Sequence, residues 1–162
     1  MLPSYKTILV ATDFTPNSDH AFDHAVLLAR QHEAKIHLLH VVPQVDTAMR
    51  SYLSSVMGED KLAEFEKKNA QNAHTDLKTE LDGFAKRELA DYPEDLARFA
   101  GAEIVVGNPV LKIIETAARL NADVIVMGTH SKGMMEHAFL GSVAEKVLQK
   151  AVRPVFVIPL QK

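Results

Sequence analysis

Short runs of consecutive apolar residues recur along the chain and are the first guide to its fold. In the first run, at residues 5–12, the central residues are apolar and do not alternate with polar ones. This pattern is typical of strands in a parallel sheet, where both faces are covered and the side chains on both faces are buried. We therefore predict strands at residues 5–12, 35–42, 102–106, 122–127 and 154–158.

Between these runs the apolar residues follow helical spacing. Thr15 and Pro16 are the predicted N-cap and first residue of one helix, and Ser18 is an alternative cap. A longer segment at 45–89 predicts one long helix or two helices broken near Gly58. Its charge-rich part, residues 59–88, is interpreted as a solvated helix face. Its predicted inner stripe is Leu62, Phe65, Leu77, Leu81 and Phe84. The other predicted helices are residues 16–32, 109–120 and 142–150.

The predicted elements alternate as strand and helix along the whole chain. Such alternation implies right-handed crossovers and a parallel sheet with helices on both faces. We predict an α/β fold, a single doubly wound domain over residues 1–162 with a five-stranded parallel sheet. Ligands of such sheets bind at the carboxyl ends of the strands, where the winding reverses. If the strands that end at Asp13 and Gly128 are neighbours, these two residues face one crevice.

The last predicted strand follows the last predicted helix, which places it at an edge of the sheet. Residues 155–158 are all apolar, and an apolar edge with unpaired backbone groups needs a cover or a partner. Pairing with the same strand of a second subunit would form a two-fold homodimer, which is the interpretation we favour. The alternative is an edge closed by Pro154 and Pro159 alone.

Composition narrows the classes of partner. The 162 residues carry a formal net charge of −3 at a pI near 6.2, so bulk charge gives no reason to expect binding to nucleic acid or an anionic membrane. No apolar run reaches membrane-spanning length, and the N-terminal residues lack the apolar core of a signal peptide. The absence of cysteine excludes disulfides and thiolate chemistry and suits a reducing compartment, so we expect a cytoplasmic protein.

The segment from Gly128 to Ser142 is the strongest candidate for a binding site. It joins a predicted strand to a predicted helix and also contains Gly133 and Gly141. Such a loop directs backbone N–H groups and the positive end of a helix dipole at one point, which suits a phosphate. Both common nucleotide fingerprints, G-x-x-x-x-G-K-[ST] and G-x-G-x-x-G, are absent from the sequence. Spacing alone leaves open a plain surface loop in which Ser142 caps the helix.

Other residues with reactive side chains carry weaker signals. His20 and His24 have a spacing that can bind a metal, but without a third ligand an exposed helix face explains them better. His130 could touch a phosphate or transfer protons, although a backbone contribution from this loop residue is the preferred interpretation. Asp13 could act as a general base, but a lone acid does not define a hydrolase.

One spacing pattern carries a family resemblance. Gly128-x-x-Ser131, nine further residues and Gly141-Ser142 resemble the ATP-binding signature G-x-x-G-x(9)-G-[ST] of the universal stress protein family. Ser131 is a departure, because it stands where the signature has its second glycine. If that position needs a positive φ, serine costs about 1 kcal/mol or more. Further segments are similar to the same family in the same order, at residues 8–13, 39–42, 107–109, 140–147 and 153–157.

The resemblance implies a Rossmann-like fold of the adenine-nucleotide alpha-hydrolase type. It also implies a site for ATP, or for AMP or ADP. Mg²⁺ held through the phosphates is an optional cofactor in this interpretation. By the same resemblance, Asp13 contacts the ribose or the adenine. The other implied contacts are Thr12 and Val41 beside the adenine, Met127 and Gly128 at the floor, and Ser131 with the backbone of Gly141, Ser142 and Val143 around the phosphates. His130 is added to the predicted binding residues because it lies in the same loop.

The predicted function is that of an adenine-nucleotide-binding universal stress protein with a regulatory or stress-tolerance role. ATP is expected between the first and fourth strands. Two alternatives stay open at this point. Ser131 favours a family member that binds no nucleotide and acts through protein–protein contacts. A slow ATP hydrolase on the same fold is the other alternative, although no acid–base set in the sequence marks a dedicated enzyme.

Overall fold

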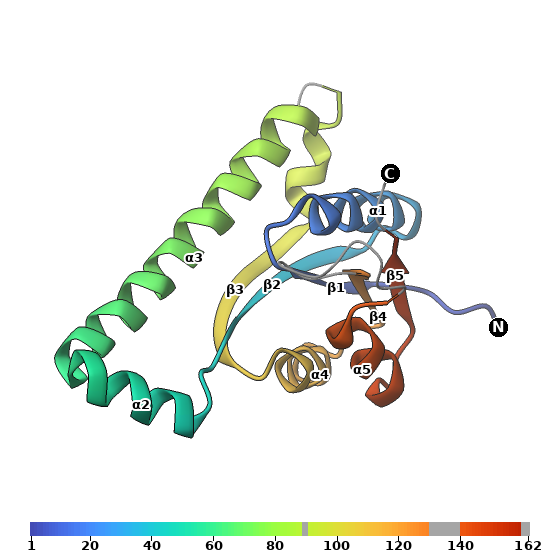
Figure 1. Ribbon diagram of the computed structural model, residues 1–162. Coiled ribbons are helices and arrows are strands. Elements are labelled where there is room, and N and C mark those ends of the chain that lie inside the picture. The colour runs from blue at the N-terminus through green and yellow to red at the C-terminus, as the bar shows by residue number, and fades with distance from the viewer. Residues whose placement is uncertain (89–90, 130–139, 160–162) are drawn as a thin grey trace.

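Strands and helices alternate along the computed structural model, which describes residues 1–88, 91–129 and 140–159 (Figure 1). Each strand predicted from the sequence is present, with shifted ends. The strands are β1 (Thr7–Thr12), β2 (Lys35–Pro43), β3 (Phe99–Gly107), β4 (Val124–Gly128) and β5 (Val155–Ile158). The helices are α1 (Pro16–His32), α2 (Thr47–Met57), α3 (Glu59–Glu88), a 3₁₀ helix η1 (Pro93–Arg98), α4 (Pro109–Arg119) and α5 (Ser142–Lys150).

The strands form one five-stranded parallel sheet in the order β3-β2-β1-β4-β5. β1 pairs with β2 on one side and β4 on the other, so that Ile8 lies opposite both Ile36 and Val124. The winding therefore reverses between β1 and β4, and the carboxyl ends of these two strands lie side by side. The prediction that the strands ending near Asp13 and Gly128 are neighbours is confirmed, as is the edge position of β5.

Helices cover both faces of the sheet, with α1 on one face and α4 and α5 on the other (Figure 1). The side chains of β1 alternate between the two cores. Ile8 and Val10 belong to the core that contains Phe22 of α1, whereas Leu9 belongs to the core that contains Ile113 of α4. All three strand residues are fully buried. Burial on both faces explains why the sequence of this strand shows no polar alternation.

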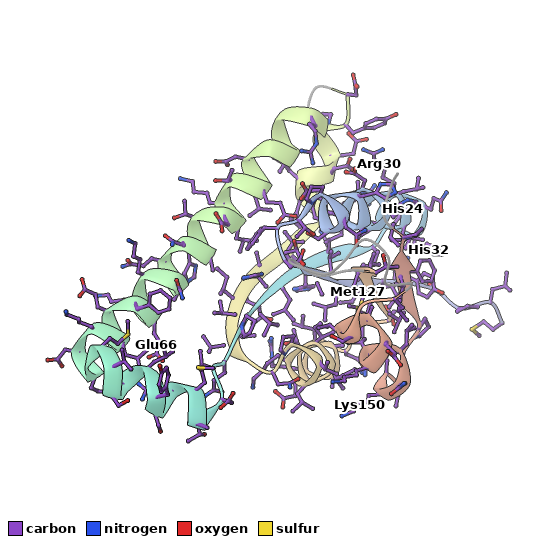
Figure 2. The ribbon with its side chains drawn as sticks, in the orientation of Figure 1. His24, Arg30, His32, Glu66, Met127 and Lys150 are labelled. Carbon is purple, nitrogen blue, oxygen red and sulfur yellow. The ribbon has the colours of Figure 1, made fainter. Side chains whose placement is uncertain are left out.

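α2 and α3 project beyond the β3 side of the sheet as an arm, defined here as residues 47–88 (Figure 1). The structure selects the alternative of two helices, because the chain breaks at Gly58, whose φ is 87°. Arg50 of α2 joins the helices through Nη2 to Glu59 at 2.7 Å and through Nε to Glu66 at 3.2 Å. Figure 2 labels Glu66 near the outer end of the arm.

The predicted inner stripe of α3 is only partly right. Leu62 and Leu77 are buried, whereas Phe65 is 50% exposed. At about 100° per residue, the buried residues Leu62, Ala73 and Leu77 span an arc of about 60° around α3, and Phe65 lies about 60° outside that arc. The prediction for Phe65 is therefore wrong. The side chain of Phe84 lies outside the described residues. No helix in the described part of the chain is both long and apolar enough to cross a membrane.

The sequence analysis missed η1 and the first residues of β3. Asp95 of η1 is 1% exposed, and its Oδ2 accepts a hydrogen bond from Arg30 Nε at 2.9 Å. The Arg30 guanidinium also lies 3.8 Å from the centre of the Tyr92 ring. Figure 2 labels Arg30 in the last turns of α1. These contacts hold η1 against α1. The hydrogen bond between Arg30 and Asp95 joins residues 65 positions apart, so no local sequence pattern reveals it.

Candidate functional site

A tight turn after β1 fixes Asp13 at the carboxyl end of the strand. Asp13 Oδ1 accepts hydrogen bonds from Thr15 N at 3.2 Å and from Thr15 Oγ1 at 2.6 Å. Phe14, between them, has a φ of 61°, a left-handed conformation that costs a non-glycine residue about 1 kcal/mol. Thr15 caps α1 as predicted, and Ser18 completes a capping box instead of serving as the cap.

A cavity of about 320 Å³ opens at the carboxyl ends of β1, β2 and β4, beside the first turns of α4 and α5. Its wall is mainly apolar, with Leu39 from β2, Ile113 from α4 and Met127 from β4. Figure 2 labels Met127 in the middle of the molecule, between the helices of the two faces. An apolar cavity with a few polar groups at the switch point of a parallel sheet is typical of a small-molecule site.

Most of the residues predicted for the site meet at this cavity. Ser142 does not line it, because Gly141 is the N-cap of α5 and Ser142 is its first residue, with an exposed side chain. The alternative in which Ser142 caps the helix is therefore wrong. His130, Ser131 and Gly133 lie outside the described residues. The predicted residues that line the cavity are Thr12, Asp13, Val41, Met127, Gly128, Gly141 and Val143.

Backbone hydrogen bonds join Thr129, directly after β4, to Gly141 at the start of α5 and to Ile158 at the end of β5. Gly141 N donates to Thr129 O at 2.6 Å, and Thr129 N donates to Ile158 O at 3.0 Å. α5 starts directly after Gly141, which provides no side-chain cap. The first-turn N–H groups of α5 therefore bring the positive end of the helix dipole to the cavity wall.

His40 of β2 lines the cavity but was not predicted as a site residue. Its Nδ1 lies 2.8 Å from the carbonyl oxygen of Thr12, and the centre of its ring is 4.4 Å from the centre of the Phe14 ring. His40 thus holds the end of β1 and the turn that follows it. The sequence signal that could have found it is its place next to Val41 in the last part of a predicted strand.

Glu80 of α3 is a second residue that the sequence analysis missed. Its Oε2 lies 3.2 Å from Thr12 Oγ1, at the back of the cavity wall. Burial raises the pKa of the Glu80 carboxyl to about 7, and the nearby charges of Asp19 and Asp13 act in the same direction, while the hydrogen bond from Thr12 opposes them. The interpretation of the charges of residues 59–88 as a solvated face does not hold for Glu80.

The histidine pair of α1 lies outside the cavity wall. The rings of His20 and His24 meet edge to face, with their centres 4.7 Å apart. Figure 2 labels His24 on α1. Across residues 1–88, 91–129 and 140–159, no three His, Cys, Asp or Glu side chains come together in a group that could hold a metal ion.

Comparison with known proteins points to one family. The family model described as the universal stress protein family matches residues 4–159. Universal stress protein MJ0577 of Methanocaldococcus jannaschii is 31% identical over 157 residues, which cover 95% of this chain and 94% of that protein. The solved structure of MJ0577 matches with a TM-score of 0.70 and 27% identity, over 99% of both chains.

Two further solved structures of the same fold are complexes with nucleotides. A universal stress protein in complex with cAMP is 20% identical with a TM-score of 0.63, and the match covers 97% of this chain and 98% of that one. The universal stress protein from Archaeoglobus fulgidus in complex with dAMP is 20% identical with a TM-score of 0.52, over 95% of this chain and 98% of that one. At this identity the likeness shows the fold, and the nucleotides belong to those two proteins.

Proposed function

This chain belongs to the universal stress protein family, and from that premise we propose that it binds an adenine nucleotide in the cavity between the ends of β1 and β4. The proposed ligand is ATP, with AMP and ADP as the other candidates. The bound nucleotide serves as a regulatory ligand in a stress-tolerance role, rather than as the substrate of a dedicated enzyme. The cytoplasmic location expected from the cysteine-free sequence stays a prediction.

The observation that carries this proposal is the convergence of the predicted site residues on one cavity. Asp13, Val41, Gly128 and Gly141 come from four different elements or their ends, yet all line the same space. Its volume of about 320 Å³ lies within the usual range for small-molecule sites. Its position at the switch point of the sheet is where ligands of this architecture bind.

The wall offers suitable chemistry for each part of a nucleotide. The apolar side chains of Leu39, Ile113 and Met127 suit the faces of a purine ring. The Asp13 carboxylate has several acceptor positions, and its fixed turn directs it at the cavity, where a sugar hydroxyl can donate to it. The backbone at Gly141 and the first turn of α5 suit the phosphates, because N–H groups and a positive dipole end favour an anion.

The remaining predicted contacts complete this proposal at the phosphates. We assign Ser131, which the family resemblance places at the phosphates, a hydroxyl bond to a phosphate oxygen, and we assign the loop residue His130 a backbone contact. Mg²⁺ bound through the phosphates would neutralise part of their charge, and it needs only one or two carboxylates from a protein. In this proposal the change from glycine to serine at position 131 is a tolerated departure from the signature.

A homodimer through β5 is the proposed assembly. β5 lies at the edge of the sheet, next to β4 alone. Val152, just before β5, is 89% exposed, and Leu148 at the end of α5 is 45% exposed, so apolar surface accompanies this edge. Pairing of the edge with a second copy would satisfy its outward backbone groups and cover these side chains.

Equilibrium dialysis of the purified chain against ATP with Mg²⁺, and separately against ADP and AMP, tests nucleotide binding. The proposal expects saturable binding of ATP that Asp13→Ala weakens while the fold is retained. A micromolar Kd would correspond to about 8 kcal/mol of binding free energy. Failure to retain any of the three nucleotides at millimolar concentration would refute the proposal in favour of a member that acts through protein contacts.

A further inference from the structure

Asn17 joins two distant parts of the chain behind the proposed nucleotide site. It lies in the first turn of α1, where it is 3% exposed. Its Nδ2 donates a hydrogen bond at 3.2 Å to the carbonyl oxygen of Ile158, 141 positions further along the chain at the end of β5. A buried amide side chain with a specific partner of this kind fixes the relative position of the elements that it joins.

The Ile158 carbonyl is the meeting point of a short network of hydrogen bonds. It accepts from Asn17 Nδ2 and also from Thr129 N, at 3.0 Å. Thr129 O in turn accepts from Gly141 N at 2.6 Å. The start of α1, the ends of β4 and β5 and the start of α5 are therefore held by consecutive bonds. Thr129 and Gly141 line the cavity, whereas Asn17 does not.

The same side chain lies against Gly128. A Cβ atom added to Gly128 would be 2.4 Å from Asn17 Oδ1 and 2.7 Å from Asn17 Cγ, closer than real side chains approach. Gly128 also lines the cavity. The carboxamide of Asn17 therefore occupies the space directly behind the cavity wall and allows only glycine at that point of β4.

We propose that Asn17 is a positioning residue for the nucleotide site and couples that site to the end of β5. This inference rests on the proposed nucleotide binding in the cavity. A nucleotide that contacts the wall at Gly128 and Thr129 stabilises the position of Thr129, and Thr129 N and Asn17 hold the same carbonyl at the end of β5. A partner strand on the free edge of β5 would order the end of that strand and so strengthen nucleotide binding. By linkage, bound nucleotide would strengthen the pairing of the partner strand by the same factor.

The test compares the full-length chain with Asn17→Ala and with a control, Val26→Ala. Val26 is a buried core residue of α1 that lies outside the cavity wall, so its truncation destabilises the fold without removing the network. Three quantities are measured for each protein: the Tm, the Kd for ATP with Mg²⁺, and the hydrogen-exchange rate of the Thr129 amide with and without ATP.

The proposal predicts a different outcome for each of the two variants. Asn17→Ala raises the Kd for ATP by about tenfold, the size expected for the loss of one positioned hydrogen bond. It also speeds exchange of the Thr129 amide without nucleotide, and it weakens the protection that ATP gives to that amide. Val26→Ala lowers the Tm but leaves the Kd and the ATP-dependent protection close to those of the wild type.

The proposal is overturned if Asn17→Ala binds ATP within twofold of the wild type and exchanges Thr129 at the wild-type rate. If Val26→Ala weakens ATP binding as much as Asn17→Ala does, loss of stability explains the effect and the positioning role also fails. If the wild type binds no nucleotide, the proposed function fails, while the exchange rate of Thr129 without ligand still tests whether Asn17 holds the network.

A second variant covers the case in which Asn17→Ala does not fold. Asn17→Asp keeps the size of the side chain but removes the Nδ2 donor to Ile158 O. Adenosine is the probe for this variant, because the uncharged nucleoside avoids repulsion between the new carboxylate and phosphates. About tenfold weaker adenosine binding than in the wild type supports the role of the donor, and unchanged binding overturns it.

Discussion

The hydroxyl of Thr12, in the wall of the cavity, lies 3.2 Å from Oε2 of Glu80, although the two residues are 68 positions apart in the sequence. Glu80 comes from α3, so this contact connects the arm to the end of β1. The carboxyl is half-buried and faces other acids, which raises its pKa to about 7. The inner part of the arm therefore carries a group that titrates near neutral pH, directly behind the proposed site.

Stability should depend on pH through Glu80. The groups around it are Asp13 and Asp19 from the β1–α1 turn and α1, and Asp76 and Arg87 from α3 itself. Its pKa is raised from 4.5 to about 7 in the folded chain, so the native state binds this proton more tightly than the unfolded state does. The free energy of unfolding contributed by this group therefore falls as the pH rises from about 4.5 to 7, by on the order of 3 kcal/mol, and is constant above that range.

Urea denaturation at several pH values between 5 and 8 checks this prediction, with Glu80→Gln as the comparison. The variant stays neutral, so its stability should fall less between pH 5 and 7, and it should be more stable than the wild type at pH 8. Equal pH dependence in the two proteins would show that Glu80 titrates as an ordinary carboxyl.

The close approach of Asn17 to Gly128 predicts a strongly non-additive pair of mutations. Gly128→Ala places a Cβ against the Asn17 carboxamide and should cost about 1–3 kcal/mol of stability as an overpacked core position. In the background of Asn17→Ala the obstacle is absent, so the same change should cost at least about 1 kcal/mol less. Denaturation of the four proteins of the cycle measures this coupling, and additive effects would contradict the described packing.

The ion pair between Asp95 and Arg30 should be important for stability. The Asp95 side chain is 1% exposed and that of Arg30 is 26% exposed, so Asp95→Ala leaves a partly buried guanidinium without this partner. We expect a loss of about 3 kcal/mol. The matched control is Glu103→Ala, which removes an exposed ion pair with Arg119 and should cost less than about 1 kcal/mol. Similar losses in the two variants, measured by denaturation, would contradict the prediction.

The proposed dimer depends on the outward backbone groups of β5. Ile125 N donates to Pro154 O, and Thr129 N donates to Ile158 O, so the backbone groups of residues 154 and 158 face β4. Backbone groups of successive strand residues point to opposite sides, so the N–H of Val157 faces the free edge. Val157→Pro removes this donor without removing a bond to β4. Sedimentation analysis should find a dimer for the wild type and a folded monomer for the variant. A folded dimer of unchanged affinity would place the interface elsewhere.

The fold could be predicted largely from local pattern. Continuous apolar runs identify the strands because Ile8 and Leu9 are buried on opposite faces, and the alternation with helices then sets the topology. The choice between one helix and two at Gly58 was left open because a single glycine in a helical pattern fits both alternatives. Phe65 and η1 were missed because their environment depends on how separate elements pack, which helical spacing alone does not specify.

The site could be predicted only in part. Gly128 and Gly141 could be predicted because glycine suits a backbone that turns at the end of a strand, and because their spacing resembles the family signature. One alternative gave the helix cap to Ser142 because spacing does not distinguish the cap from the first helical residue, and Gly141 takes the cap. Asn17 and Glu80 gave no signal, since their partners lie 141 and 68 positions away.

The central claim is that the cavity binds an adenine nucleotide, and calorimetric titration of nucleotide-stripped protein with ATP and Mg²⁺ tests it most directly. The control is Gly141→Val, which places a branched side chain in the cavity wall at the start of α5. The account predicts saturable heat with a micromolar Kd for the wild type, equivalent to about 8 kcal/mol, and its loss in a variant that remains folded. No heat and no rise in Tm for the wild type at millimolar ATP would contradict it.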